Sequence, residues 1–253
     1  MPRRSQNPKK GSQSVDNNVQ AQSQHGQNPK TGFGLAKIKP LTENQASAFD
    51  SYHKGSNLML HGCAGTGKTF IALNLALEDV LSGGNQKKKV VIVRSVVPTR
   101  DMGFLPGNQK EKARVYESPY YSICTELFGR GDAYETLKSK GMIDFITTSF
   151  IRGITLDNCV IIVDEPQNMG SMELHSIMTR LGQNSSIIFA GDTRQDDLTS
   201  VRKKEESGLS EFMRILRVMK SFDFIEFGEQ DIVRSELVKE YIITRNKLGL
   251  DWL

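Results

Sequence analysis

A glycine-rich stretch, HGCAGTGKTF at residues 61–70, constrains the fold of this chain most strongly. It contains Gly62, four further residues, and then Gly67, Lys68 and Thr69, which is the spacing of a loop that wraps around phosphate groups. Glycine suits such a loop because backbone amides converge on the phosphates, and a Cβ atom would obstruct the turn and the approach. Such a loop is expected between a strand and a helix.

The residues on either side fit that context. NLMLHG (57–62) is a short apolar run typical of a strand, and residues 70–81 place apolar side chains at helical spacing until Gly83 and Gly84. We therefore predict a strand, a phosphate loop, a helix, and binding of ATP or GTP with Mg²⁺. The residues expected around the nucleotide phosphates are Gly62, Cys63, Ala64, Gly65, Thr66, Gly67, Lys68 and Thr69.

The rest of the chain alternates between strand-like and helix-like patterns. Further strands are predicted at 89–96, 143–148, 158–165, 185–192 and 223–227. Most are continuous apolar runs, which indicates strands covered on both faces, as in a parallel sheet. Helices are predicted at 171–181, 208–219 and 231–247. The pattern predicts an α/β fold of three layers with a mostly parallel sheet.

Composition separates a tail from a folded domain. Residues 1–35 are rich in Asn and Gln and poor in aliphatic side chains, so we expect a disordered tail and a domain over 36–253. The tail carries five basic residues and one acidic residue, which accounts for the net charge of +4 of the whole chain. A basic arm of this kind acts either as a weak, solvated tether or as a contact to nucleic acid.

Three cysteines, Cys63, Cys124 and Cys159, have no CxxC spacing, so neither a disulfide framework nor a zinc site is expected. The chain has no apolar run of membrane-spanning length and no secretion signal. A soluble protein of the reducing cytoplasm, without a membrane partner, is the expectation.

The second chemical motif is VIIVDEPQ (160–167), an apolar strand that ends in two carboxylates. Asp164 is placed to hold Mg²⁺, as is the hydroxyl of Thr69, and Glu165 is placed to polarise the water that attacks the γ-phosphate. Two acids at a strand end could instead cap a helix. The phosphate loop favours hydrolysis, because the metal and the nucleophile need both parts.

A third motif follows the strand at 185–192. Gln195, in TRQDD (193–197), is placed beyond a strand next to the phosphate loop, where a polar side chain can sense the γ-phosphate. The other interpretation of 191–197 is a polar turn.

Together these motifs resemble the PhoH-like proteins, phosphate-starvation-inducible ATPases related to superfamily 1 helicases. The resemblance covers about residues 40–248. Its motifs, in order, are GCAGTGKT, FLPG (104–107), FIRGITL (150–156), VIIVDEPQ, TRLG (179–182), GDTRQDDL (191–198), SGL (207–209) and DIVRSELV (231–238).

The resemblance implies a RecA-like P-loop ATPase core and gives roles to further residues. Gln45, in LTENQASAF (41–49), looks like an adenine-reading residue; otherwise it is an ordinary helix-start residue with Thr42 as its cap. Asp192 and Gln195 match a helicase motif that couples the γ-phosphate to substrate contact. The chain departs from the family at Cys63, where proline is usual, and at Pro166, where alanine is usual. Pro166 is expected to restrain Glu165 to an extended conformation.

A superfamily 1 motor normally closes two RecA-like domains on one ATP, and this chain has residues for one. The resemblance therefore implies a homo-oligomeric ring, expected to be a hexamer, in which a neighbouring copy supplies an arginine to the transition state. The arginines in motif-like surroundings are Arg152, Arg180 and Arg234. Each could instead form a surface ion pair.

Residues 98–129 form a long connection that a ring could use, with its neighbours, to line a channel for single-stranded nucleic acid. RNA is favoured over DNA as that partner, but the sequence leaves both open. Phosphate contacts would come from basic residues and base stacking from tyrosines, unless these tyrosines belong to the core or to a subunit interface. The basic residues are Arg94, Arg100, Lys110, Lys112 and Arg114, and the tyrosines are Tyr116, Tyr120 and Tyr121.

Three functions remain open at this point. The favoured one is an oligomeric ATPase of RNA helicase or nucleic-acid remodelling type. The second is a nucleotide-gated binding module without turnover. The third, a small-molecule kinase, is disfavoured because neither an arginine-rich lid nor an acceptor pocket is visible in the sequence.

Overall fold

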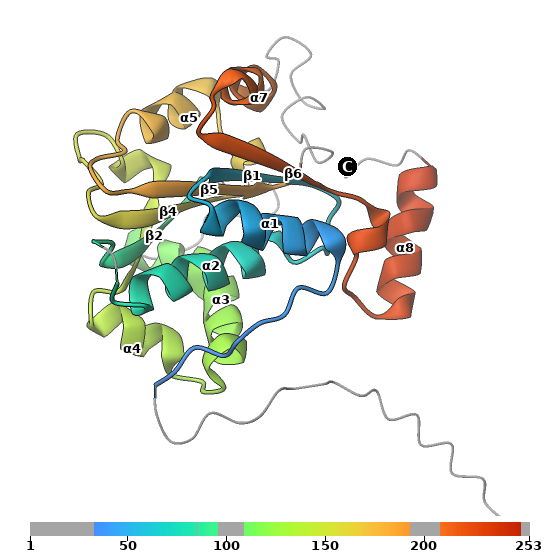
Figure 1. The fold of residues 1–253 in the computed structure, drawn as a ribbon, viewed down its shortest axis with the longest axis horizontal. Coiled ribbons are helices and arrows are strands. Elements are labelled where there is room, and N and C mark those ends of the chain that lie inside the picture. The colour runs from blue at the N-terminus through green and yellow to red at the C-terminus, as the bar shows by residue number, and fades with distance from the viewer. Residues whose placement is uncertain (1–32, 85, 96–108, 193–207, 249–253) are drawn as a thin grey trace, which may run out of the picture.

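The computed structural model describes residues 33–84, 86–95, 109–192 and 208–248, and for residues 109–114 it describes the backbone alone. The described chain forms a six-stranded sheet in the order β3-β2-β4-β5-β1-β6, and every strand pair is parallel (Figure 1). The strands are β1 (Asn57–Gly62), β2 (Lys89–Arg94), β3 (Ile143–Thr147), β4 (Cys159–Asp164), β5 (Ser186–Gly191) and β6 (Phe222–Phe227). Each strand predicted from the apolar runs is confirmed.

Helices connect the strands. They are α1 (Glu43–His53), α2 (Lys68–Leu81), α3 (Gln109–Phe128), α4 (Ala133–Ser139), α5 (Ser171–Met178), α7 (Gly208–Val218) and α8 (Glu236–Lys247), with the 3-10 turns η1 (Thr148–Phe150), η2 (Pro166–Asn168) and η3 (Glu229–Asp231). The last helix begins five residues later than predicted, because η3 ends at Asp231, residues 232–235 are not helical, and Ser235 is the N-cap of α8.

The sheet separates two hydrophobic cores. Successive residues of a strand point to opposite faces, so Leu58 and Leu60 lie in one core and Met59 in the other. Helices α1 to α4 pack on the first face, and α5 and α7 on the second (Figure 1). The predicted three-layer α/β architecture is confirmed.

The carboxyl ends of the strands meet at one edge of the sheet. Arg94 of β2 lies opposite Asp164 of β4 and opposite Thr147 of β3. On the other side of β4, Asp164 lies opposite Ala190 of β5. In a parallel α/β sheet this edge is where ligands bind.

Part of the long segment 98–129 is more regular than its sequence suggested. Residues 109–128 form α3, a helix that contains Pro119. Tyr120, Cys124 and Leu127 are buried at helical spacing, so core packing holds the helix despite the proline. Residues 98–108 lie outside the described residues.

Two of the residues that were expected in the tail contact the folded domain. The ring of Phe33 stacks on Phe128 of α3, with 4.7 Å between centroids, and Leu35 packs against the first core. Phe33 and Leu35 therefore make apolar contacts that composition alone does not predict.

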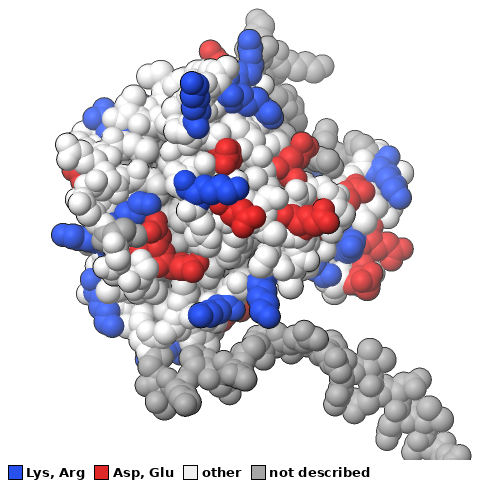
Figure 2. All heavy atoms as spheres, in the orientation of Figure 1, with Lys and Arg blue, Asp and Glu red and all other residues white. Residues whose placement is uncertain are grey.

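Charge is mixed on the surface. Figure 2 shows acidic and basic side chains interspersed over the face that carries α1. No helix among the described residues is long and apolar enough to cross a membrane.

Candidate nucleotide-binding site

The phosphate loop joins β1 to α2, as predicted, and its glycines have left-handed backbones. The φ angles of Gly62, Gly65 and Gly67 are 111°, 75° and 82°. A Cβ atom on Gly62 would lie 2.3 Å from the carbonyl oxygen of Phe227. The next residue, Cys63, donates its backbone N–H to that same oxygen at 2.8 Å. Strand β6 therefore fixes the start of the loop.

Lys68, the first residue of α2, is folded onto the loop. Its Nζ donates to the carbonyl oxygens of Gly62 and Cys63 at 2.9 and 2.6 Å. Burial lowers the pKa of Lys68, and the carboxylates of Asp192 and Glu165 oppose that shift. The ammonium therefore lies where the loop and the acidic strand ends meet.

Thr69 joins the loop to the acidic strand. Its hydroxyl donates to Oδ1 of Asp164, at the end of β4, at 2.8 Å. A hydroxyl and a carboxylate are hard oxygen donors of the kind that Mg²⁺ prefers, and Mg²⁺ in nucleotide sites uses few protein ligands besides the phosphates. The two residues predicted to hold the metal thus lie together and fit that ion.

Two further side chains surround Asp164. Tyr120 of α3 donates its hydroxyl to Oδ2 at 2.7 Å, and Nη1 of Arg94 lies 3.7 Å from the same oxygen. Tyr120 is buried, which favours the core position over base stacking, the two alternatives that the sequence left open for it. Tyr121 is half-buried against Tyr134, with 4.3 Å between ring centroids, which is a core contact too. Tyr120 and Asp164 are 44 residues apart, so the sequence pattern did not predict their contact.

Glu165 has an unusual backbone. Its φ and ψ of 53° and 51° are left-handed, so the extended conformation expected from Pro166 is wrong. The Glu165 N–H donates to Ala190 of β5, while its carbonyl accepts from Asn168 and so opens η2. A non-glycine residue in this region is held there by its surroundings.

The Glu165 carboxyl is partly buried and is held in one orientation. Gln167 donates its amide N–H to Oε2 of Glu165, and its Oε1 accepts from the backbone N–H of Asp192. Burial raises the pKa of Glu165, and the neighbouring Asp164 raises it further. A carboxylate with a raised pKa is a better proton acceptor near neutral pH. Gln167 was not singled out by the sequence, while Gln195, the predicted sensor, lies outside the described residues.

Gln45 lies beside the loop. It is buried, its Nε2 donates to the carbonyl of Thr66 at 3.2 Å, and its Oε1 accepts from Leu41 at 2.8 Å. Thr42 caps α1 by accepting the N–H of Gln45, as the sequence predicted. The loop and α1 are thereby fixed to one another.

The three arginines lie in different places. Arg234 is beside the loop, since a Cβ on Gly65 would lie 3.1 Å from its Cγ. Arg152 is exposed beyond β3. Arg180 follows α5, and its buried Nε has no partner within the described residues. Only Arg234 lies close to the phosphate loop of its own chain.

These groups together can hold a nucleoside triphosphate and activate water. Loop amides, Lys68 and the N-terminus of α2 offer positive charge to phosphates, the Thr69–Asp164 pair offers metal ligands, and Glu165 offers a base.

The chain is similar in sequence to known proteins of one family. A model of the family described as "PhoH-like protein" matches residues 37–244. The PhoH-like protein of Bacillus subtilis (strain 168) is 35% identical over 187 residues, which cover 74% of this chain and 57% of the relative. The PhoH-like protein of Synechocystis sp. is 32% identical over 206 residues, 81% of this chain and 61% of the relative. The chain therefore spans about three fifths of the length of these relatives.

Solved structures show weaker similarity. The Pif1 helicase from Candida albicans has a TM-score of 0.39 at 16% identity, covering 83% of this chain and 44% of that one. The large terminase from a thermophilic bacteriophage, in complex with ADP, has a TM-score of 0.42 at 12% identity, covering 79% and 49%. Kinship therefore rests on the family match and on the sequence identity to the curated relatives. The chain belongs to the family of PhoH-like proteins.

Proposed function

We propose that this chain binds ATP with Mg²⁺ at the carboxyl edge of β1 and β4 and hydrolyses it. The observation that carries the proposal is the 2.8 Å hydrogen bond between Thr69 and Asp164. This contact brings the phosphate loop and the acidic strand end to one place, and nucleotide hydrolysis needs both.

Each residue has a definite role in this proposal. Lys68 leaves its two carbonyl partners and contacts the β- and γ-phosphates, with the amides of residues 62–69 around them. Thr69 and Asp164 would hold Mg²⁺, which when bound neutralises charge on the phosphate oxygens. Gln45 would read the adenine, since it lies against Thr66 of the loop.

Glu165 acts as the base. Its carboxylate accepts a proton from the attacking water, and Gln167 keeps one carboxylate oxygen in place. Gln195 remains the proposed sensor of the γ-phosphate, together with the neighbouring Asp192.

We further propose that the active form is a homo-oligomeric ring, a hexamer, that acts on single-stranded RNA in the cytoplasm. An arginine finger across the interface would come from Arg152, Arg180 or Arg234. The three free cysteines fit a reducing compartment.

The test is ATP turnover by the purified chain with Mg²⁺, with and without single-stranded RNA, in parallel with mass-resolved oligomeric state. We expect RNA to stimulate turnover. Lys68→Ala should abolish ATP binding and turnover, whereas Glu165→Gln should abolish turnover and keep binding. ATP binding without turnover in every oligomeric state would contradict hydrolysis and favour the nucleotide-gated binding module.

A further inference from the structure

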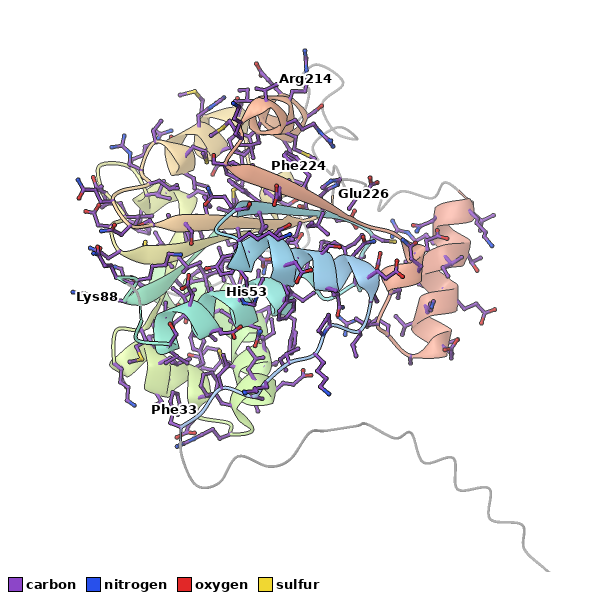
Figure 3. The ribbon with its side chains drawn as sticks, viewed as in Figure 1. Phe33, His53, Lys88, Arg214, Phe224 and Glu226 are labelled. Atoms are coloured by element: carbon purple, nitrogen blue, oxygen red, sulfur yellow. The ribbon has the colours of Figure 1, made fainter. Side chains whose placement is uncertain are left out.

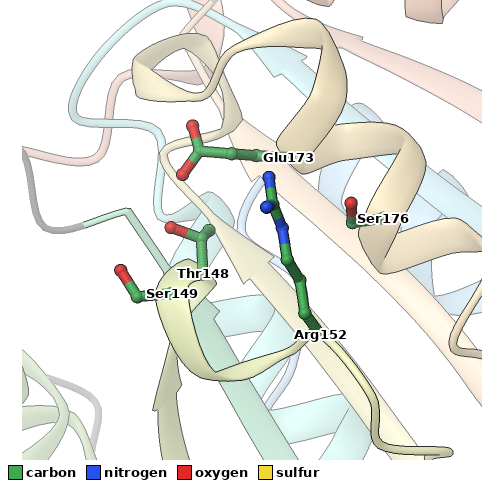
Figure 4. A pocket seen from close by; sticks show the side chains of 5 residues that line it. All are labelled: Thr148, Ser149, Arg152, Glu173 and Ser176. Atoms are coloured by element: carbon green, nitrogen blue, oxygen red, sulfur yellow. The ribbon is translucent and has the colours of Figure 1, made fainter.

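A pocket of about 430 Å³ lies near the same edge of the sheet as the nucleotide site. It is lined by Thr148, Ser149, Arg152, Glu173 and Ser176 (Figure 4). The first two residues belong to η1, directly after β3, and the last two belong to α5, which follows η2. Thr147, at the end of β3, is opposite Arg94, which is itself opposite Asp164, so β2 lies between the strand that leads into η1 and the strand that ends in Asp164.

One wall of the pocket offers unused hydrogen-bond donors. Within the described chain, the guanidinium of Arg152 has neither a hydrogen bond nor an ion pair, and the hydroxyls of Thr148 and Ser149 have no partner. Arg152 and Ser149 are exposed. These groups can bind an anion at little cost, because no internal contact has to break.

The opposite wall offers an acceptor that is held in place. Oε2 of Glu173 accepts the backbone N–H of Gly170 at 2.9 Å, and Oε1 lies 3.5 Å from the hydroxyl of Ser95. Figure 4 shows Arg152 reaching across the pocket toward Glu173, yet the two residues form no ion pair in the described structure. A carboxylate has about four acceptor positions, so Glu173 can accept another hydrogen bond from a ligand.

A ligand that satisfies both walls presents an anion at one end and a hydrogen-bond donor, such as a hydroxyl, at the other. A ribose phosphate has this chemistry, because its phosphodiester is an acceptor and its 2′-hydroxyl is a donor a few ångströms away. The corresponding deoxyribose lacks the donor and would leave Glu173 facing only the sugar ring. The pocket volume is within the range of about 300–1,000 Å³ that small-molecule sites occupy.

We propose that this pocket binds one ribose phosphate of single-stranded RNA and makes the chain prefer RNA over DNA. Arg152 and the hydroxyls of Thr148 and Ser149 contact the phosphodiester, and Glu173 accepts a hydrogen bond from the 2′-hydroxyl. This inference rests on the proposed function. It makes Glu173 the residue that selects RNA over DNA. It also assigns Arg152 to binding the RNA phosphate and not to the arginine finger.

The test measures binding of fluorescent oligonucleotides of about 12 nucleotides by anisotropy, with oligo-rU, oligo-dU and 2′-O-methyl oligo-U in parallel. The wild-type chain should bind oligo-rU most tightly, since the other two have no 2′-hydroxyl donor. Glu173→Gln keeps a carbonyl for the Gly170 N–H and turns an NH₂ group toward the pocket. It should reduce the preference for oligo-rU over the 2′-O-methyl oligomer about tenfold.

Arg152→Ala should weaken binding of all three oligomers by a similar factor, about tenfold, because a phosphate contact is common to them. Ser149→Ala, at an exposed position, should cause a smaller loss of affinity for all three oligomers. It provides the test if Arg152→Ala or Glu173→Gln fails to fold. The matched control is Lys88→Ala, which removes one positive charge at the amino end of β2, the opposite edge of the sheet (Figure 3). It should leave all three affinities unchanged.

Binding of a fluorescent ATP analogue, measured in every variant, separates this inference from the proposed function. Unchanged selectivity in Glu173→Gln, or unchanged affinity in Arg152→Ala, would overturn the pocket proposal and leave ATP hydrolysis standing. Binding of uridine monophosphate as tightly as the oligomer would reassign the pocket to a free nucleotide. A wild-type chain that binds ATP but none of the oligomers would overturn both the pocket and the RNA substrate.

Discussion

The hydroxyl of Tyr120 donates a 2.7 Å hydrogen bond to Oδ2 of Asp164, and the Asp164 Oδ1 accepts the hydroxyl of Thr69. Both carboxylate oxygens are therefore oriented, one by helix α3 and one by the phosphate loop. Because Tyr120 is buried, its position follows the packing of α3 against the sheet. Movement of α3 would be transmitted to the proposed metal ligand.

Tyr120→Phe tests this positioning role. The variant loses one hydrogen bond to a charged group, so we expect the free energy of unfolding to fall by about 1.5–3 kcal/mol. We also expect the Mg²⁺ concentration for half-maximal ATP turnover to rise several-fold. If the hydrogen bond served stability alone, its loss would leave this Mg²⁺ concentration unchanged. A magnesium titration of steady-state turnover measures it.

Tyr134→Phe is the matched control. The hydroxyl of Tyr134 is buried without a partner in the described chain, so its removal takes away an unsatisfied polar group. The unfolding free energy should stay constant or rise by about 1 kcal/mol, with an unchanged magnesium requirement. A loss of stability equal to that of Tyr120→Phe would show that the hydrogen bond is not the cause.

The pH dependence of ATP turnover should follow the ionisation of the Glu165 carboxyl. Burial raises the pKa of its carboxyl above the ordinary value, and the base works only when ionised. As pH falls, turnover should therefore decline at a higher pH than an ordinary glutamate would give. Glu165→Gln should abolish turnover, and any residual rate, lower by a factor of about 10² or more, should lack this acid limb.

Gln167→Ala should shift the acid limb of the pH–turnover profile to still higher pH. The amide of Gln167 stabilises the ionised carboxyl and lowers its pKa, so its removal raises the pKa of Glu165 and shifts the limb to higher pH. Asn168→Ala, in the same 3-10 turn, is the control and should leave the profile in place. A profile that moves equally in both variants would point to a change in the turn.

Lys68→Met should separate binding from stability. Burial lowers the pKa of Lys68, so the charged form destabilises the folded state at pH values below the lowered pKa. This cost declines as pH rises from the lowered pKa to the ordinary pKa of an unfolded lysine. The variant should lose ATP binding while its free energy of unfolding, by urea denaturation, stays within about 1 kcal/mol of wild type. A loss well above that value would indicate that Lys68 stabilises the loop.

Gly62→Ala should destabilise the chain. The added Cβ would lie 2.3 Å from the backbone oxygen of Phe227, and a backbone atom cannot move aside easily. Gly55→Ala is the control, because Gly55 also has a positive φ, of 94°, but nothing within 4 Å. The control should cost about 1–2 kcal/mol in urea denaturation, and Gly62→Ala about 2 kcal/mol more.

The sequence by itself determined the strands, the layers and the two chemical motifs. Continuous runs such as CVIIVD in β4 can only be buried on both faces, and the glycines of the phosphate loop permit a backbone that other residues resist. These are local properties, so periodicity and spacing express them directly.

Only the tertiary structure decided what surrounds the acids. The contact of Tyr120 with Asp164 spans 44 residues, and the left-handed backbone of Glu165 follows from its simultaneous bonds to β5 and η2. The pairing of Arg94 with Asp164 depends on β2 being next to β4, an order that does not follow the chain. Strand order and register decide which side chains distant in sequence come into contact. The pattern of neighbouring residues along the chain specifies neither the strand order nor the register.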